Sequence, residues 1–146
     1  MLAVVLAAVA FMIWTFQSIV MVPERALPTA GEADAASFLH YHQAAADWAA
    51  RTSAASGSAA SLELPAGDAP RTDWGHLVVE GRLYSFTQAT YTVTPGFLAA
   101  VAGAGGRACR RPADDSALLR CTWGDMPLPS SLLTDVAAGA VVMAGG

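Results

Sequence analysis

The first segment of the chain is the feature that most constrains its fold. Residues 2–22, LAVVLAAVAFMIWTFQSIVMV, contain no charged side chain. As a helix, these twenty-one residues would extend about 31 Å, the thickness of the apolar layer of a bilayer. The run is longer than the apolar part of a secretory signal, lacks a basic start and has no cleavage pattern directly after it. We therefore expect an uncleaved transmembrane anchor at residues 1–22, with a cleaved signal or a buried soluble helix as the alternatives.

The remainder of the chain is long enough for one domain with a core. Residues 23–32 contain two prolines and a glycine that interrupt a continuing helix, so we expect a short neck there. Residues 33–146 then form the domain. Within it, residues 53–61, SAASGSAAS, are small, polar and without periodicity, which predicts a flexible segment.

Cys109 and Cys121 are the only two cysteines of the chain. The residues between them contain a turn pattern, PADDS, and no histidine, so they do not supply the four ligands of a zinc site. We expect a disulfide across a hairpin that stabilises the fold by about 3 kcal/mol on the loop-entropy argument; two unpaired cysteines in a reduced interior are the alternative. Because disulfides persist in oxidising compartments, we expect a single-pass inner-membrane protein with its body in the periplasm, although Arg25 weakly favours the opposite orientation.

A helix is predicted from about Ala33 to Thr52, because apolar residues recur there at helical spacing. Its large aromatic side chains are Phe38, Tyr41 and Trp48. We assign them to the core face against a sheet, with a groove for another protein as the alternative.

The two histidines of this helix do not form a metal site. His40 and His42 are two positions apart, so a helix points them about 200° away from each other. The residue four positions after each is an alanine, which also excludes the spacing of helical zinc ligands. We expect ordinary hydrogen bonds for both, and a solvated position for Asp47.

The second half of the chain alternates short apolar runs with turn residues, which favours strands. We expect strands at residues 76–80 and 83–87 around a Gly81-Arg82 turn, and further strands at 90–93, 118–123 and 140–144. Residues 94–103 read as a short helix, and residues 128–139 as a short helix or ordered loop. The predicted fold is α+β: an N-terminal transmembrane helix, then an amphipathic helix packed on a small antiparallel sheet.

Composition and motifs argue against several function classes. Charged residues make up 14% of the chain, the net charge is −4, and no run of basic residues is present, so we expect no nucleic-acid partner. Neither a G-x-S-x-G elbow nor a phosphate-binding G-x-x-x-x-G-K-[ST] loop occurs. We assign no catalytic, cofactor-binding or metal-binding residue, and we expect neither an enzyme nor a small-molecule substrate.

The order of these features resembles a known family. The apolar run is followed by FLHYHQAAADWA, a small polar linker, the tryptophan-led hairpin DWGHLVVEGRLYSFT, PGFLAAVA and a final GAVVMAGG. This looks like the PilM family of type IV thin-pilus biogenesis proteins of conjugative plasmids. The resemblance implies an inner-membrane component of the pilin transport apparatus or pilus basal body, with other pilus proteins as partners and no active-site residues.

We therefore expect a membrane-anchored, non-enzymatic component of a pilus assembly apparatus. A minor pilin or pseudopilin is one alternative, but the chain has no glycine before Gly31 and no acidic residue before Glu24, so the pilin processing pattern is missing. Pro23 and Pro28 also interrupt the continuous helix of a pilin. A secreted periplasmic binding protein or hydrolase is the other alternative.

Overall fold

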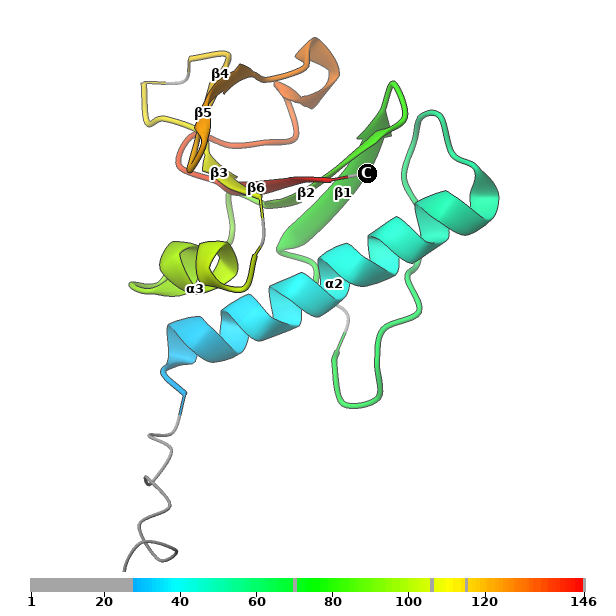
Figure 1. The fold of residues 1–146 in the computed structure, drawn as a ribbon, viewed down its shortest axis with the longest axis horizontal. Coiled ribbons are helices and arrows are strands. Elements are labelled where there is room, and N and C mark those ends of the chain that lie inside the picture. Colours follow the sequence, from blue (N-terminus) through cyan, green and yellow to red (C-terminus); the bar gives the residue numbers. More distant parts are fainter. Residues whose placement is uncertain (1–27, 70, 106, 115, 146) are drawn as a thin grey trace, which may run out of the picture.

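The computed structural model describes residues 28–69, 71–105, 107–114 and 116–145, and shows an α+β domain (Figure 1). Its elements follow one another as α2 (Ala30–Thr52), β1 (Trp74–Val79), β2 (Arg82–Thr87), α3 (Phe97–Gly103), β3 (Ala108–Arg110), β4 (Leu118–Cys121), β5 (Gly124–Pro127), the short 3-10 helix η1 (Ser130–Leu132) and β6 (Val141–Gly145).

Helix α2 begins three residues earlier than predicted because of a capping box. The Thr29 side chain accepts a hydrogen bond from the amide of Glu32 at 3.3 Å, and the Glu32 carboxylate accepts one from the amide of Thr29 at 2.7 Å. The helix ends at Thr52, and the following residue, Ser53, caps it in the left-handed conformation with φ 49°. Its buried stripe includes Phe38 and Tyr41 and lies against the sheet.

The strands form one antiparallel sheet in the order β1-β2-β6-β3-β4-β5. The last strand, β6, lies between the β1–β2 hairpin and the β3–β4–β5 meander and joins them. The β1–β2 turn is Glu80–Gly81, one residue before the predicted position. Both turn residues have positive φ, 52° and 75°, which is the backbone of a type I′ turn.

Two hydrophobic clusters lie on the two faces of the sheet. One face packs against α2 and α3, which lie side by side in Figure 1. The other face packs against residues 128–140 through Leu128, Leu132 and Val136. Because side chains alternate along a strand, β2 contributes Leu83 to the helix side and Tyr84 to the opposite side.

The predicted fold class and localisation need a correction. No helix in the described residues is long and apolar enough to cross a membrane. Helix α2 has sufficient length, at 23 residues, but it carries Glu32, Asp34, Asp47 and Arg51 and packs on the sheet. The predicted anchor, residues 1–22, lies outside the described residues. The structure therefore does not support the N-terminal transmembrane helix or the single-pass inner-membrane localisation. The residues that it describes form two α-helices and a short 3-10 helix packed on a six-stranded antiparallel sheet.

One further segment differs from the expectation, and the structure locates another. Residues 90–93 are a turn and loop rather than a strand, because Tyr91 packs into the core beside α2 and hydrogen-bonds Asp34 at 3.0 Å. Residues 53–61 follow the edge of β1, where Gly57 and Val78 exchange two backbone hydrogen bonds of 2.8 and 3.0 Å. The flexibility of this segment stays a prediction.

Candidate functional site: a groove at the edge of β1

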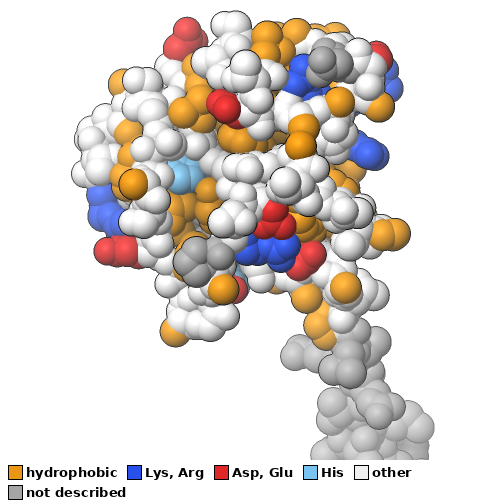
Figure 2. All heavy atoms as spheres, turned by 180° about the vertical axis from the view of Figure 1, so that it is seen from behind, with side chains coloured by type: hydrophobic (Ala, Val, Ile, Leu, Met, Phe, Trp, Pro, Cys, Tyr) orange, Lys and Arg blue, Asp and Glu red, His pale blue; other side chains and the backbone are white. Residues whose placement is uncertain are grey.

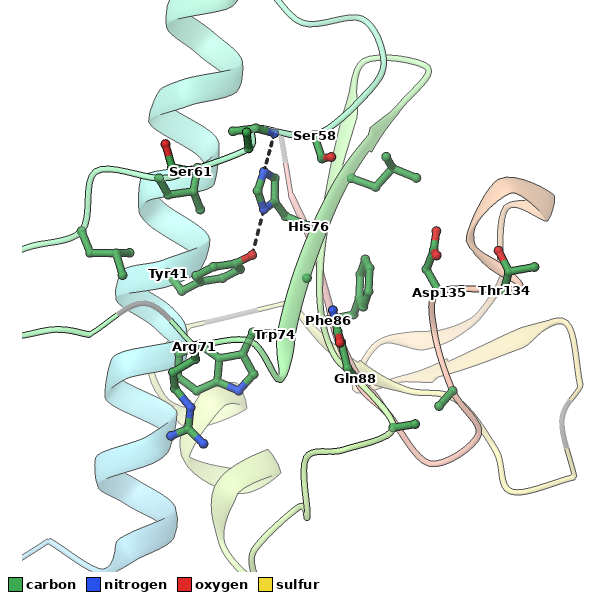
Figure 3. A pocket seen from close by; sticks show the side chains of 18 residues that line it. Tyr41, Ser58, Ser61, Arg71, Trp74, His76, Phe86, Gln88, Thr134 and Asp135 are labelled. Carbon is green, nitrogen blue, oxygen red and sulfur yellow. Dashed lines mark hydrogen bonds between the residues drawn. The ribbon is translucent and has the colours of Figure 1, made fainter.

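A cavity of about 680 Å³ opens along β1, the edge strand of the sheet. Figure 3 shows its walls: α2 and residues 58–64 on one side of β1, and the end of β2 with residues 134–137 on the other. From behind, a histidine side chain is visible in a hollow, and a small group of basic and acidic side chains lies on the same face (Figure 2). We refer to this cavity as the β1 groove.

His76 connects three elements at the groove. Its Nδ1 lies 2.8 Å from the hydroxyl oxygen of Tyr41 on α2, and its Nε2 accepts a hydrogen bond of 2.9 Å from the amide of Ala59 (Figure 3). An acceptor nitrogen carries no proton, so the proton of the neutral ring sits on Nδ1 and is donated to the Tyr41 oxygen. The ring is therefore held in one tautomer by α2 and by the segment along β1.

Burial keeps this pair uncharged. It lowers the pKa of His76 from 6.5 and raises the pKa of Tyr41 to about 12. At neutral pH both groups are neutral, and both imidazole nitrogens are engaged in hydrogen bonds. The arrangement positions the segment around Ala59 against the strand and packs the His76 ring edge-to-face against Trp48, whose ring centroid is 5.6 Å away.

Arg71 connects several residues at the end of the groove where β1 begins. Its guanidinium donates to Asp73 at 2.7 and 3.0 Å and to Asp34 of α2 at 3.0 Å. It also lies over the rings of Trp74 and Tyr91, at 4.6 and 5.4 Å from their centroids. The hydrogen bonds and charge of Arg71 lower the pKa of Asp73, and the hydrogen bond to Asp73, with the neighbouring negative charges, raises the pKa of Arg71.

Trp74 lines the groove with an unused hydrogen-bond donor. Its side chain is 5% exposed, and its indole Nε1 has no acceptor among the residues that the structure describes. Buried donors without a partner are uncommon in folded proteins. The nitrogen is itself enclosed by protein atoms, so the unused donor belongs to the wall of the groove and not to its open surface.

The outer edge of β1 is open next to Trp74. The backbone groups of Val78 point outward, because they bond Gly57. In an antiparallel strand every second residue has the same orientation, so the backbone N–H and C=O groups of Trp74 and His76 also point outward. In the described part of the chain, the Gly57–Val78 bridge is the only pairing on this edge. A second strand can therefore pair with β1 between Trp74 and His76.

The residues singled out from the sequence lie in two places. Phe38 is fully buried in the core, Tyr41 is buried and reaches the groove, and Trp48 is partly buried against His76. Cys109 and Cys121 face each other in β3 and β4 and form a disulfide, away from the groove.

The helix histidines point to different partners. His40 is exposed and pairs with Asp68 at 2.7 Å, whereas His42 is partly buried and bonds the Ser85 hydroxyl at 2.9 Å. Asp47 accepts a hydrogen bond from its helical neighbour Gln43 at 2.9 Å. Within the described ranges, no three potential metal-ligating side chains come together.

Sequence reasoning missed His76, Arg71 and Trp74 as site residues. A signal was present for two of them: in WGHLVV the alternation of a strand places Trp74 and His76 on the same face. The role of Arg71 depends on contacts with α2 and with residue 91, and no local pattern indicates them.

The fold and the groove define the class of the protein: a small α+β domain in which the edge strand β1 is paired on its outer side only at Val78 within the described residues. The chain belongs to the PilM family, whose model matches residues 4–144. The crystal structure of a PilM protein from Escherichia coli B7A has a similar fold: the TM-score is 0.53 at 18% sequence identity, over 84% of this chain and 99% of the other. No curated protein matches the chain. The family gives the chain a role in pilus biogenesis, together with other pilus assembly proteins.

Proposed function

We propose that the chain is a non-enzymatic component of a type IV thin-pilus assembly apparatus of the conjugative-plasmid kind, acting in pilin transport or in the pilus basal body. In this role the β1 groove holds an extended segment of another pilus protein. Family membership supports the general role, and the groove supports a binding rather than a chemical task.

The observation that carries the proposal is the open backbone edge of β1 at Trp74. The outward backbone groups of Trp74 lie on this edge. An extended peptide that adds a strand to a sheet edge satisfies backbone groups of this kind and places alternate side chains in adjoining pockets. The cavity beside β1 offers space for such side chains.

The polar groups of the groove support the non-enzymatic part of the proposal. A histidine acts as a general base through a ring nitrogen that is free to accept a proton from a nucleophile. Both nitrogens of His76 are engaged, the pKa of Tyr41 is about 12, and the Arg71 guanidinium is paired with two carboxylates. These contacts hold elements of the domain together.

Site-specific photo-crosslinking in cells that assemble the pilus tests the proposal. A photoreactive residue at Gln88, on the exposed rim of the groove, should capture another pilus protein. The matched control is the same residue at Ala99, exposed on α3 and outside the groove. Equal capture at both positions, or none at Gln88, would contradict a groove-specific partner.

Trp74→Phe provides the second arm, because it reshapes the wall of the groove next to the open edge and keeps an aromatic ring. We expect weaker crosslinking at Gln88 and fewer pili, and Trp48→Phe, which changes a tryptophan outside the cavity lining, is the control. The melting temperature of each variant separates loss of binding from loss of folding. Recovery of the chain in sheared pilus fibres would replace the proposed role with that of a minor pilin.

A further inference from the structure

A second pocket lies at the opposite end of the β1–β2 hairpin, on the face that turns away from α2. Its volume is about 240 Å³. Two arginines, Arg82 and Arg107, and one tryptophan, Trp123, line it together with Met126 and Ala144. We refer to it as the arginine pocket.

The strand register brings the two arginines together. Arg82 begins β2 two residues before Tyr84, so both side chains lie on the same face, and Tyr84 is paired with Ala144 of β6. On the other side of β6, the amide of Ala144 donates to the carbonyl of Arg107 at 3.3 Å. Because Arg107 precedes the buried Cys109 by two residues, its side chain lies on that face too. The two guanidinium groups therefore flank the end of β6.

The disulfide positions the tryptophan of the pocket. Trp123 lies in the two-residue turn between β4 and β5 and is 51% exposed, a high value for such a large apolar side chain. The residue before the turn, Cys121, is bonded to Cys109 of β3, and the amide of Thr122 donates to the carbonyl of Ala108 at 3.4 Å. These links fix the turn beside β3, next to Arg107.

The charge of the pocket is not balanced by the described part of the chain. Arg51 and Arg71 form ion pairs with carboxylates, and Arg110 donates to a backbone carbonyl. Arg82 and Arg107 have neither an ion pair nor a side-chain hydrogen bond within the described residues. Two like charges at one site repel each other unless an anion lies between them.

The acidic residues nearest in sequence do not neutralise the pocket. Met126 is paired with Leu119 and faces the pocket side, so its neighbour Asp125 points to the other face, opposite Arg120. Glu80 lies in the β1–β2 turn and is exposed, and it forms no ion pair in the described residues.

We propose that the arginine pocket binds an acidic segment of a partner protein, with a carboxylate between Arg82 and Arg107 and a neighbouring apolar side chain on Trp123 and Met126. Guanidinium groups bind carboxylates through paired hydrogen bonds, and an exposed tryptophan provides a large apolar contact at low entropic cost. A nucleic acid does not fit this surface, because a chain with a net charge of −4 repels a long polyanion beyond two local cations.

Calorimetric titration of the purified chain with defined probes tests the inference. The probes are a capped decapeptide of alternating glutamate and alanine, its glutamine counterpart, and inorganic phosphate. We expect the acidic peptide to bind in the submillimolar range at low salt and about 10-fold more tightly than the glutamine peptide. Arg82→Gln and Arg107→Gln should each weaken this binding by about 5- to 10-fold.

Arg51→Gln is the matched control, because it removes the same charge from an exposed helix position outside the pocket. If it weakens binding as much as Arg82→Gln, the peptide is attracted by overall charge and the inference is wrong. Absence of peptide binding at millimolar concentration also overturns it. Phosphate binding as tight as that of the peptide would instead show a site for small anions.

Trp123→Phe supplies an independent readout. The indole fluorescence of the wild-type chain should change when the acidic peptide binds, and this change should be lost in the variant. A change that persists unaltered would come from another tryptophan and would exclude the arginine pocket. None of these measurements requires the β1 groove to be occupied, so the two proposals fail separately.

Discussion

Acidification from neutral pH should destabilise the domain through two histidines. Burial lowers the pKa of both His76 and His42 from 6.5. The unfolded chain therefore binds protons near pH 6.5 that the folded chain does not bind. The stability that depends on the neutral rings is fully present above pH 6.5, and it is lost as the pH falls from there toward the lowered folded-state pKa values.

The magnitude follows from the number of protons. Each proton bound only by the unfolded chain lowers the free energy of unfolding by about 1.4 kcal/mol per pH unit. Two histidines give up to about 2.8 kcal/mol per unit, which is a large part of the 5–15 kcal/mol typical of a domain. Protonation of His76 would also set an N–H group at Nε2 against the amide of Ala59 and remove that hydrogen bond.

Urea unfolding followed by circular dichroism at several pH values between about 7 and 5.5 measures this slope, because this range includes the usual pKa of histidine and lies above that of free carboxyl groups. His42→Gln and His76→Gln should each reduce the slope by about half, because each removes one of the two protons. If the wild-type chain is equally stable or more stable at the lower pH, the histidines are not held neutral as the structure indicates.

Three other substitutions test the packing. Phe38→Ala should lower the free energy of unfolding by about 3–5 kcal/mol in urea titrations, because the ring is fully buried. Gly31→Ala should lower the melting temperature, because a Cβ there would lie 2.5 Å from the carbonyl oxygen of Pro95; an unchanged value would mean that this loop adapts without cost. Replacing both Cys109 and Cys121 by serine should cost about 3 kcal/mol, and a reducing agent should then no longer affect stability.

Elements with strong local signals could be predicted from the sequence. Helix α2 has a capping residue, helical spacing of its aromatic residues and a small-residue stop, and the β1–β2 hairpin has a turn glycine between two alternating runs. Strands β3 and β5 have three and four residues, and they contain arginine, aspartate and proline. Pairing with β6 and β4 creates these strands, and a window of sequence does not contain that information.

The candidate site was predictable only in part for the same reason. The sequence predicts the aromatic face of α2, and Tyr41 belongs to it. Its partner His76 is 35 residues away, and the Arg71–Asp34 pair spans 37 residues. Such contacts depend on how the sheet docks on the helix. The sequence does not predict the arginine pocket either. Arg82 and Arg107 come close only because β6 lies between β2 and β3 in the sheet.

The two proposed binding surfaces are separated along the β1–β2 hairpin. Trp74 pairs with Thr87 at one end, and Arg82 pairs with Val79 at the other. Five residue steps along a strand span about 17 Å, beyond the 7–10 Å within which substitutions usually couple. Trp74→Phe and Arg82→Gln should therefore have additive effects on partner binding if one extended partner contacts both ends. A combined loss clearly different from the sum would show that the hairpin transmits a change between them.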